Sequence, residues 1–142
     1  MRTTALFMIL FVFFGMTSAQ GTPEEISKSF FDLVGQKKYS EAVQSLPASK
    51  QLEADTALNT RLLVKLKGLG MKDGEYCGFE LITKEEVSPS YVVLTYFIKY
   101  MDVPQRIQLT FYKPKDVWQV IQVSLNIQSR HSMMGRKQNA RQ

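Results

Sequence analysis

The residues of this chain whose types could do chemistry are mainly tyrosines and carboxylates. Five of the six tyrosines fall in segments with the composition of β-strands: Tyr76, Tyr91, Tyr96, Tyr100 and Tyr112. A phenol hydroxyl that lines a pocket can orient a ligand or polarise a carbonyl. Strand tyrosines more often serve packing and interfaces. We take Tyr76, Tyr96 and Tyr100 as the candidate tyrosines of a ligand pocket.

Two carboxylates complete the set of candidate pocket residues. Asp32 falls in a predicted helix, away from its apolar stripe, and Glu80 falls within the first predicted strand. A carboxylate beside a tyrosine hydroxyl could act as a general acid or base. Charged residues at such positions are more often solvated surface groups. A catalytic tyrosine–carboxylate pair therefore stays an alternative, and we predict no catalytic residue.

Histidine and cysteine are too scarce for several common kinds of active site. His131 is the one histidine and lies beyond the last predicted strand, and Cys77 is the one cysteine. A histidine-based acid/base mechanism, a histidine-rich metal site and a Cys/His nucleophile pair all lack residues. We therefore predict no metal and no cofactor. A lone cysteine in a strand pattern is most often a buried small hydrophobe, which is our prediction for Cys77, with an interchain bridge or a reactive thiol as alternatives.

The net charge of +5 is concentrated at one end of the chain. Residues 20–128 hold 13 Lys and Arg and 13 Asp and Glu, and the excess lies in residues 129–142. The basic residues of this tail are Arg130, Arg136, Lys137 and Arg141. A neutral body with a basic tail does not indicate a nucleic-acid-binding fold. We predict that the tail is disordered and solvated, with contact to an anionic surface as the alternative.

The first 19 residues have the pattern of a cleavable signal peptide. Arg2 is followed by a run of apolar residues and glycine over residues 5–16, which is shorter than the about 20 residues of a membrane-spanning helix. Small residues at 17–19 then predict cleavage before Gln20. An uncleaved anchor is the alternative. We expect an exported, periplasmic or secreted protein with a signal peptide over 1–19, one domain over 20–128 and a tail over 129–142.

The segment after the signal peptide predicts three helices. Thr22, Pro23 and Glu25 form the pattern of a capping box, and Gly35 is expected to cap the end of the first helix. A short second helix follows from about residue 37 and stops before Pro47. A third helical stretch is predicted from about 49 to 66, closed by two glycines at 68 and 70.

Further along the chain, the period of the apolar residues changes from that of a helix to that of a strand. Strands are predicted over about 75–84, 91–101, 107–112 and 117–126, with a β-bulge near Ile121. The connections between them are too short for crossover helices, so the strands should pair antiparallel. The sequence predicts an α+β domain in which three helices pack on one face of a curved four-stranded antiparallel sheet.

This order of elements resembles the nuclear-transport-factor-2-like (NTF2-like, or cystatin-like) superfamily, and in particular its small exported bacterial domains of unknown function. The resemblance covers about residues 22–127. It rests on the opening amphipathic helix, the step from Gly35 to Ala42 and the strand segments 91–96, 111–112 and 117–120. The resemblance implies a cone-shaped domain whose curved sheet surrounds a helix-lined pocket, often with dimers formed through the outer face of the sheet.

The segment 91–101 is apolar on both faces of the predicted strand. One face can pack on the helices, and the other would leave an apolar patch that soluble monomers avoid. We expect a homodimer through the outer sheet face, with cover by long neighbouring side chains as the alternative. The expected function is that of an exported, non-catalytic binding or accessory domain of the bacterial envelope, with a small apolar ligand as a possible partner. The alternatives are a small-molecule enzyme with a tyrosine–carboxylate pocket and an assembly module that docks through its basic tail.

Overall fold

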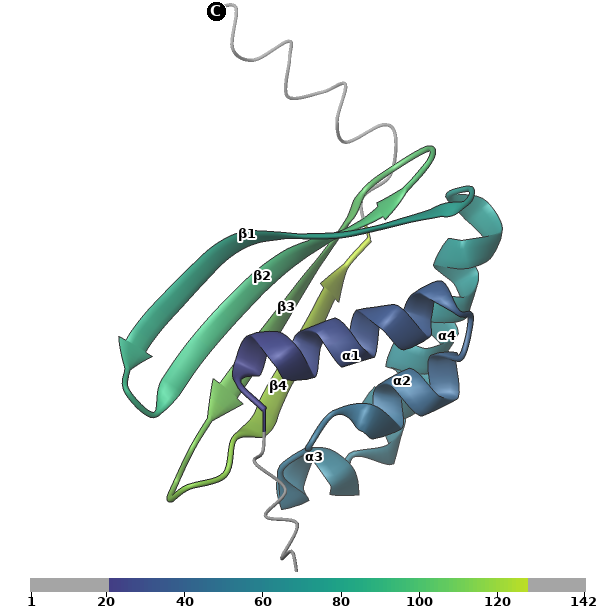
Figure 1. The fold of residues 1–142 in the computed structure, drawn as a ribbon. Coiled ribbons are helices and arrows are strands. Elements are labelled where there is room, and N and C mark those ends of the chain that lie inside the picture. The colour runs from purple at the N-terminus through teal and green to yellow at the C-terminus, as the bar shows by residue number, and fades with distance from the viewer. Residues whose placement is uncertain (1–20, 128–142) are drawn as a thin grey trace, which may run out of the picture.

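The structure, a computed structural model, describes residues 21–127. Four helices come first and four strands follow, and the helices lie on one side of a strongly curved sheet (Figure 1). The elements are α1 (Pro23–Gly35), α2 (Tyr39–Ser45), α3 (Lys50–Ala54), α4 (Thr56–Lys72), β1 (Tyr76–Ser88), β2 (Tyr91–Tyr100), β3 (Gln105–Tyr112) and β4 (Gln119–Asn126). The predicted α+β class is confirmed. The expected signal peptide and basic tail lie outside the described residues.

Helix α1 begins as predicted and ends at Gly35, but its cap lies beyond the glycine. The Thr22 side chain accepts a hydrogen bond from the backbone of Glu25, and the Glu25 carboxylate accepts one from the backbone of Thr22. At the other end, Lys37 takes the left-handed conformation with φ of 61°. The backbone N–H groups of Lys37 and Lys38 donate to Val34 and Leu33. This is a Schellman motif, so Gly35 is the last helical residue rather than the cap.

The third predicted helical stretch is two helices, which corrects its predicted extent. Asp55 separates α3 from α4, and its carboxylate accepts a hydrogen bond of 2.9 Å from the backbone N–H of Leu58. This cap starts a new helix in the middle of the stretch. At the far end, α4 continues through Gly68 and Gly70 to Lys72. Tertiary packing of its buried face outweighs the weak helix propensity of glycine.

The four strands form an antiparallel meander in the order β1-β2-β3-β4. The bulge predicted near Ile121 is confirmed, because Thr110 pairs with Gln122 while Phe111 pairs with Val120. A second bulge lies in β1 at Cys77, where Tyr76 pairs with Tyr100 and Gly78 with Lys99. The extra residue turns Tyr76 towards the helices and leaves Cys77 exposed. The prediction of a buried Cys77 is therefore wrong, because the bulge shifts the alternation of the strand.

The core between the helices and the sheet is filled by large apolar side chains. Phe30 and Phe31 of α1 are fully buried, and the Phe31 ring stacks on Phe79 with centroids 4.6 Å apart. The sheet contributes fully buried residues from its three later strands: Leu94, Ile98, Ile107, Leu109, Phe111 and Val120. Within residues 21–127, no helix has both the length and the apolar character that a membrane crossing needs. This core holds the start of β1 and the end of β2 against α1. It therefore positions the tyrosines at those two strand ends.

The outer face of the sheet is more polar than the sequence of β2 alone suggests. Phe97 pairs with Glu80 on one side and with Arg106 on the other, and it is half-buried. Val93 is half-buried as well, between Glu85 of β1 and a threonine of β3. Polar neighbours thus border the apolar residues of β2 on both sides. The homodimer through this face stays a prediction.

Candidate functional site

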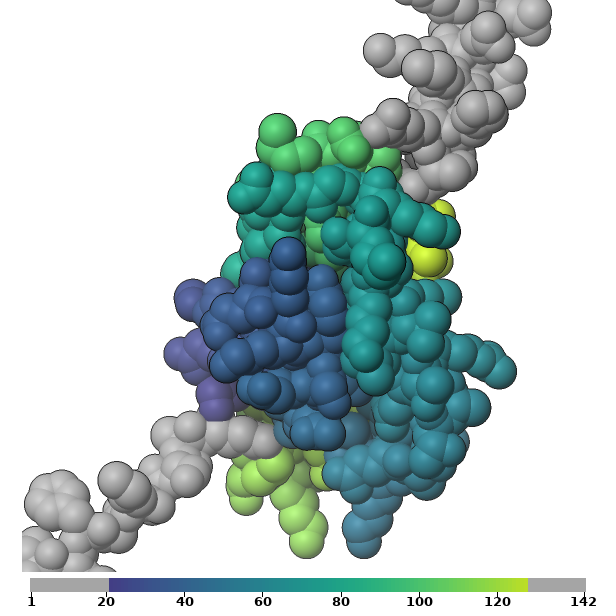
Figure 2. Space-filling model, turned by 90° about the vertical axis from the view of Figure 1, so that its right-hand side faces the viewer, coloured from purple at the N-terminus to yellow at the C-terminus, as the bar shows by residue number. Residues whose placement is uncertain are grey.

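A pocket of about 420 Å³ lies where the ends of α1 and α4 meet the start of β1. We call it the tyrosine pocket; its lining residues are Val34, Gly35, Lys37, Tyr39, Gly70, Gly74, Glu75, Tyr76 and Tyr100. Figure 2 shows this side of the molecule, with the blue α1–α2 region beside the teal end of α4 and start of β1. Its volume falls in the range of small-molecule sites. Two of the five candidate residues, Tyr76 and Tyr100, meet here.

Tyr76 is fixed in the pocket wall by a hydrogen bond to the backbone of α1. Its hydroxyl donates to the carbonyl oxygen of Phe31 over 3.1 Å. Burial, and secondarily the negative charge of Asp32, raises the pKa of Tyr76 from 10.0 to about 12. The phenol therefore remains protonated at neutral pH and keeps its donor role.

Tyr100 is the most unusual residue of the pocket. Its side chain is only 6% exposed, and its hydroxyl is the one buried side-chain oxygen or nitrogen within residues 21–127 that has no hydrogen-bond partner. Burial raises the pKa of Tyr100, and the neighbouring hydroxyls of Tyr39 and Tyr76 and the charge of Asp73 act in the same direction. A buried hydroxyl without a partner costs about 1–3 kcal/mol. Native proteins rarely leave such groups unpaired, and a water, an ion or a ligand in the pocket can supply the missing bond.

Glycines keep the pocket open where side chains would close it. A Cβ on Gly35 would lie 2.6 Å from Cε1 of Tyr76, and a Cβ on Gly70 would lie 2.5 Å from the hydroxyl oxygen of Tyr39. Neither position could carry a side chain without moving a tyrosine. Both glycines had been assigned only to helix ends in the sequence. The absence of a side chain at these two positions lets Tyr76 and Tyr39 lie against the helices.

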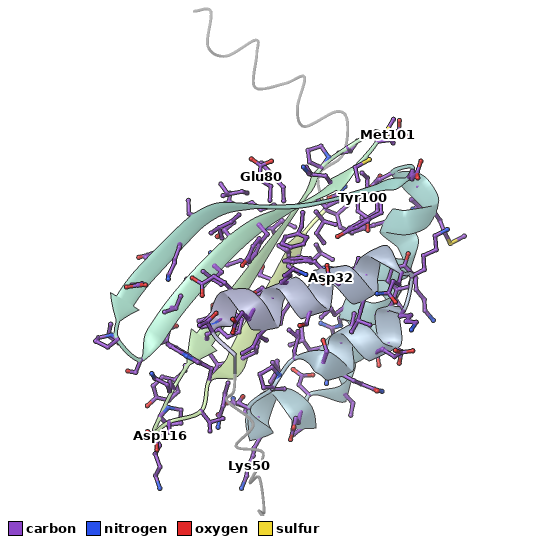
Figure 3. All side chains as sticks on the ribbon, in the orientation of Figure 1. Asp32, Lys50, Glu80, Tyr100, Met101 and Asp116 are labelled. Atoms are coloured by element: carbon purple, nitrogen blue, oxygen red, sulfur yellow. The ribbon has the colours of Figure 1, made fainter. Side chains whose placement is uncertain are left out.

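The other three candidate residues lie elsewhere. Tyr96 is buried in the core with its ring against Phe31, where burial raises the pKa of its hydroxyl and a hydrogen bond with Ser27 opposes this effect. Asp32 is exposed on α1 and forms an ion pair of 2.6 Å with Lys28. Glu80 points away from the helices on the outer side of the sheet, whereas Tyr100 points towards them (Figure 3). The charge of Asp32 acts on Tyr76, but both carboxylates are exposed and neither lines the tyrosine pocket.

Sequence reasoning missed Tyr39, which lines the pocket from the start of α2. In the sequence it appears among the apolar residues of a short helix, and that assignment is correct, because its ring packs on the core. The signal that could have found it is Gly70, since glycine inside a helix often marks a close approach.

No carboxylate in the described part of the chain is buried beside a tyrosine hydroxyl. Glu75, the one carboxylate among the lining residues, is exposed. The buried polar residues are Ser27, Thr95, Gln105 and Thr110. Among residues 21–127, no three acidic, cysteine or histidine side chains are grouped as a metal site would need. The pocket is lined by three phenol groups, one lysine and one exposed carboxylate.

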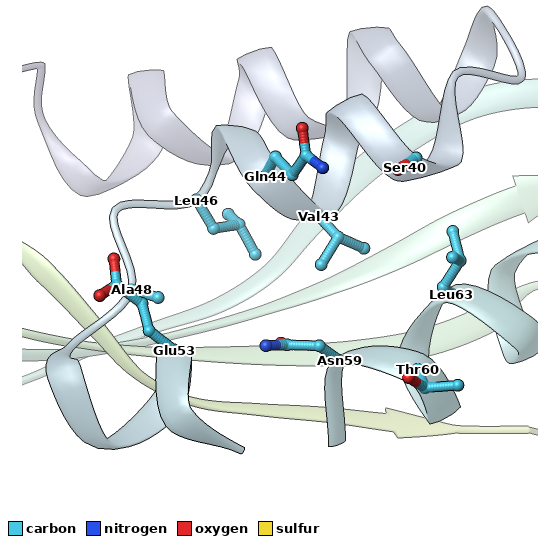
Figure 4. A pocket seen from close by; sticks show the side chains of 9 residues that line it. All are labelled: Ser40, Val43, Gln44, Leu46, Ala48, Glu53, Asn59, Thr60 and Leu63. Carbon is cyan, nitrogen blue, oxygen red and sulfur yellow. The ribbon is translucent and has the colours of Figure 1, made fainter. Parts of the chain in front are cut away.

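A second pocket of about 400 Å³ lies among α2, α3 and α4 (Figure 4). We call it the helix pocket; its lining residues are Ser40, Val43, Gln44, Leu46, Ala48, Glu53, Asn59, Thr60 and Leu63. Its amide donor is already used, because the Asn59 side chain donates to the carbonyl oxygen of Leu52 over 3.3 Å. Most of its polar side chains, including Gln44 and Glu53, are exposed. Water can satisfy them, so nothing in this pocket requires a ligand.

A third hollow of about 210 Å³ lies at the start of α1, beside Trp118. Lys84 forms ion pairs there with Glu24 over 2.6 Å and with Glu86 over 2.8 Å. Burial opposes the shift, but the hydrogen bond and charge of Lys84 lower the pKa of Glu24. Each of these three charged side chains has an ion-pair partner within the protein.

A solved structure of a bacterial protein has the same architecture. It belongs to a Campylobacter jejuni protein provisionally named an NTF2-like transpeptidase, with a TM-score of 0.55 and 14% sequence identity. The likeness covers 72% of this chain and 99% of that one. The fold is NTF2-like. No protein-family model and no curated protein matches the chain. At this identity the likeness carries the fold alone, and the pocket must be interpreted from its own residues.

Proposed function

We propose that this protein is an exported, non-catalytic binding domain of the bacterial envelope, and that the tyrosine pocket holds its small-molecule ligand. One observation carries the proposal: the Tyr100 hydroxyl is buried without a partner beside a pocket of about 420 Å³. A bound molecule that supplies the missing hydrogen bond would recover its cost. The signal-peptide pattern of residues 1–19 supports export.

Two catalytic alternatives have less support from the described residues. The tyrosine–carboxylate enzyme needs a buried carboxylate that faces a phenol, and Asp32 and Glu80 are both exposed. The second alternative is a transpeptidase, as the Campylobacter jejuni protein is named. Group-transfer enzymes often use a nucleophilic side chain that a neighbouring base activates. Cys77 is exposed, its thiol contacts the carbonyl oxygen of Glu75, and residues 21–127 contain no histidine to activate it.

Native mass spectrometry of the protein purified from its own host tests the proposal. We expect a chain that begins at Gln20 and carries a small molecule. In the Gly70→Leu variant the molecule should be lost, because the new side chain collides with Tyr39. Gly68→Leu is the matched control on the same helix, since no atom lies within 4 Å of its added Cβ.

The outcome that contradicts the proposal is equally specific. A ligand-free wild-type mass would contradict the binding function. A ligand retained equally by Gly70→Leu and Gly68→Leu would place the binding site outside this pocket. The same spectra report the number of subunits, and a monomer alone would show the predicted homodimer to be wrong.

A further inference from the structure

Three phenol rings from three separate elements line the tyrosine pocket. Tyr39 begins α2, Tyr76 begins β1 and Tyr100 ends β2. The rings of Tyr76 and Tyr100 meet edge to face, with centroids 6.0 Å apart and an angle of 74° between their planes. Aromatic faces attract cations, and cages of such rings bind ammonium groups. The ring lining therefore favours a cation over a neutral group of the same size.

Two helices also end at this pocket. Val34 and Gly35 are the last residues of α1, and Gly70 lies in the last turn of α4. The C-terminal end of a helix carries a partial negative charge, which attracts cations and repels anions. Helix α1 has no basic residue in its last turn, although Lys37 and Lys38 follow its C-cap, and α4 has Lys72 in its last turn. The backbone therefore adds to the negative potential of the rings.

The charged side chains that line the pocket are Glu75 and Lys37, and two further carboxylates lie close by. Glu75 lines it, and the charge of Asp73 acts on the Tyr100 hydroxyl. A carboxylate oxygen of Asp102 lies 3.3 Å from where a Cβ of Gly74 would be. The one cation among the lining residues is Lys37, which is exposed. Solvent screens an exposed lysine more than it screens the helix ends and the partly buried Asp73.

From these features, and resting on the proposed function, we infer that the tyrosine pocket selects ligands that carry an organic ammonium group. The ammonium group lies among the three rings, and one of its N–H groups donates to the hydroxyl oxygen of Tyr100. The apolar part of the ligand contacts Val34. The negative helix ends and Glu75 then exclude carboxylates and phosphates of similar size.

Titration of the mature protein with three matched probes tests this inference. Amide chemical shifts are recorded at neutral pH. Benzylamine, benzyl alcohol and phenylacetate share one ring and one methylene group and differ in the charge of the head group. We expect benzylamine to shift the amides of Gly35, Gly70 and Gly74, and to bind about tenfold more tightly than benzyl alcohol. Phenylacetate should leave these amides unchanged.

Two exposed residues provide variants that separate charge from folding. Glu75→Gln should weaken benzylamine binding about threefold, and Lys37→Gln should strengthen it by about the same factor, because each change alters one screened charge near the cation. Structural damage would weaken benzylamine binding in both variants, so opposite changes in affinity would come from the charges. Equal binding of benzyl alcohol and benzylamine, tighter binding of phenylacetate, or weaker benzylamine binding in Lys37→Gln would overturn the inference.

The fate of the proposed function is decided separately. If none of the three probes binds while the host-purified protein carries a ligand that Gly70→Leu loses, the ammonium inference is wrong and the binding function stands. If no probe binds and no ligand co-purifies, both are wrong.

Discussion

The tyrosine pocket and the helix pocket have nearly the same volume, about 420 and 400 Å³, and differ in what their walls need. The helix pocket has exposed polar side chains that water can satisfy, and its Asn59 amide is bonded within the protein. The tyrosine pocket has a buried hydroxyl with no partner, on Tyr100. The comparison teaches that volume alone does not identify a binding site. An unsatisfied buried group adds a chemical reason for one, because the protein bears its cost until a partner supplies the missing bond.

The largest effect on the free energy of unfolding is expected from a side chain at Gly35, beside Tyr76 in the wall of the tyrosine pocket. Gly35→Ala places a Cβ 2.6 Å from the Tyr76 ring, which a hydrogen bond to Phe31 holds in place. We expect a loss of about 1–3 kcal/mol in the free energy of unfolding from the overpacking. Urea titration measures it. An unchanged midpoint would show that Tyr76 moves freely and that the pocket wall is not rigid.

Removing the Tyr76 hydroxyl, which is hydrogen-bonded within the protein, should cost less. Tyr76→Phe deletes the hydrogen bond to the Phe31 carbonyl and leaves that oxygen without this donor. We expect the free energy of unfolding to fall by about 1 kcal/mol. In the helix pocket, Asn59→Ala removes a comparable bond to Leu52 and should cost a similar amount without any effect on ligand content. Loss of the co-purified ligand from Asn59→Ala would move the site to the helix pocket.

Alkaline pH should weaken the tyrosine pocket in a predictable range. The pKa of Tyr76 is raised from 10.0 to about 12, so its contribution to stability is complete below pH 10 and is lost as the pH rises towards 12. The free energy of unfolding should therefore fall between those values. Urea titrations across this range measure the fall, which should be smaller in Tyr76→Phe. An equal fall in the variant would assign the effect to other groups.

The smallest effect is expected at Gly68, two residues from a pocket glycine on the same helix. Its added Cβ meets no atom within 4 Å, so Gly68→Ala should raise the free energy of unfolding by about 0.5–1 kcal/mol through helix propensity. Gly70→Ala gains the same propensity but must displace the Tyr39 hydroxyl, 2.5 Å away. Thermal melting of the two variants compares them. A larger gain for Gly70→Ala would mean that Tyr39 does not need its observed position.

Local sequence rules predicted those parts of the fold that local interactions decide. The capping box of Thr22 and Glu25 was recognisable because all its partners lie within three residues. The bulge at Ile121 was recognisable because the buried residues of β4 change phase there. The alternating residues of β3 likewise predicted its buried face, with Ile107, Leu109 and Phe111 in the core.

The site could be predicted only in part, because long-range contacts create it. Tyr76 and Tyr100 were candidates as strand tyrosines, but only the register of β1 and β2 shows that they pair. The bulge at Cys77 turns Tyr76 inward, and it lies at the very start of β1, where no preceding alternation can reveal it. Gly35 was interpreted as a helix cap. Its contact with Tyr76 joins residues 41 positions apart in the chain, so propensity contains no trace of it.

The central claim is that the protein keeps the Tyr100 hydroxyl unpaired for a ligand. The free energy of unfolding of Tyr100→Phe, measured by urea titration with and without the co-purified ligand, tests it most directly. Without ligand, the variant should be more stable than wild type by about 1 kcal/mol, because a buried unpaired hydroxyl is removed. With ligand, it should gain less stability than wild type does. A variant that is less stable without ligand and equally stabilised by it would contradict the account.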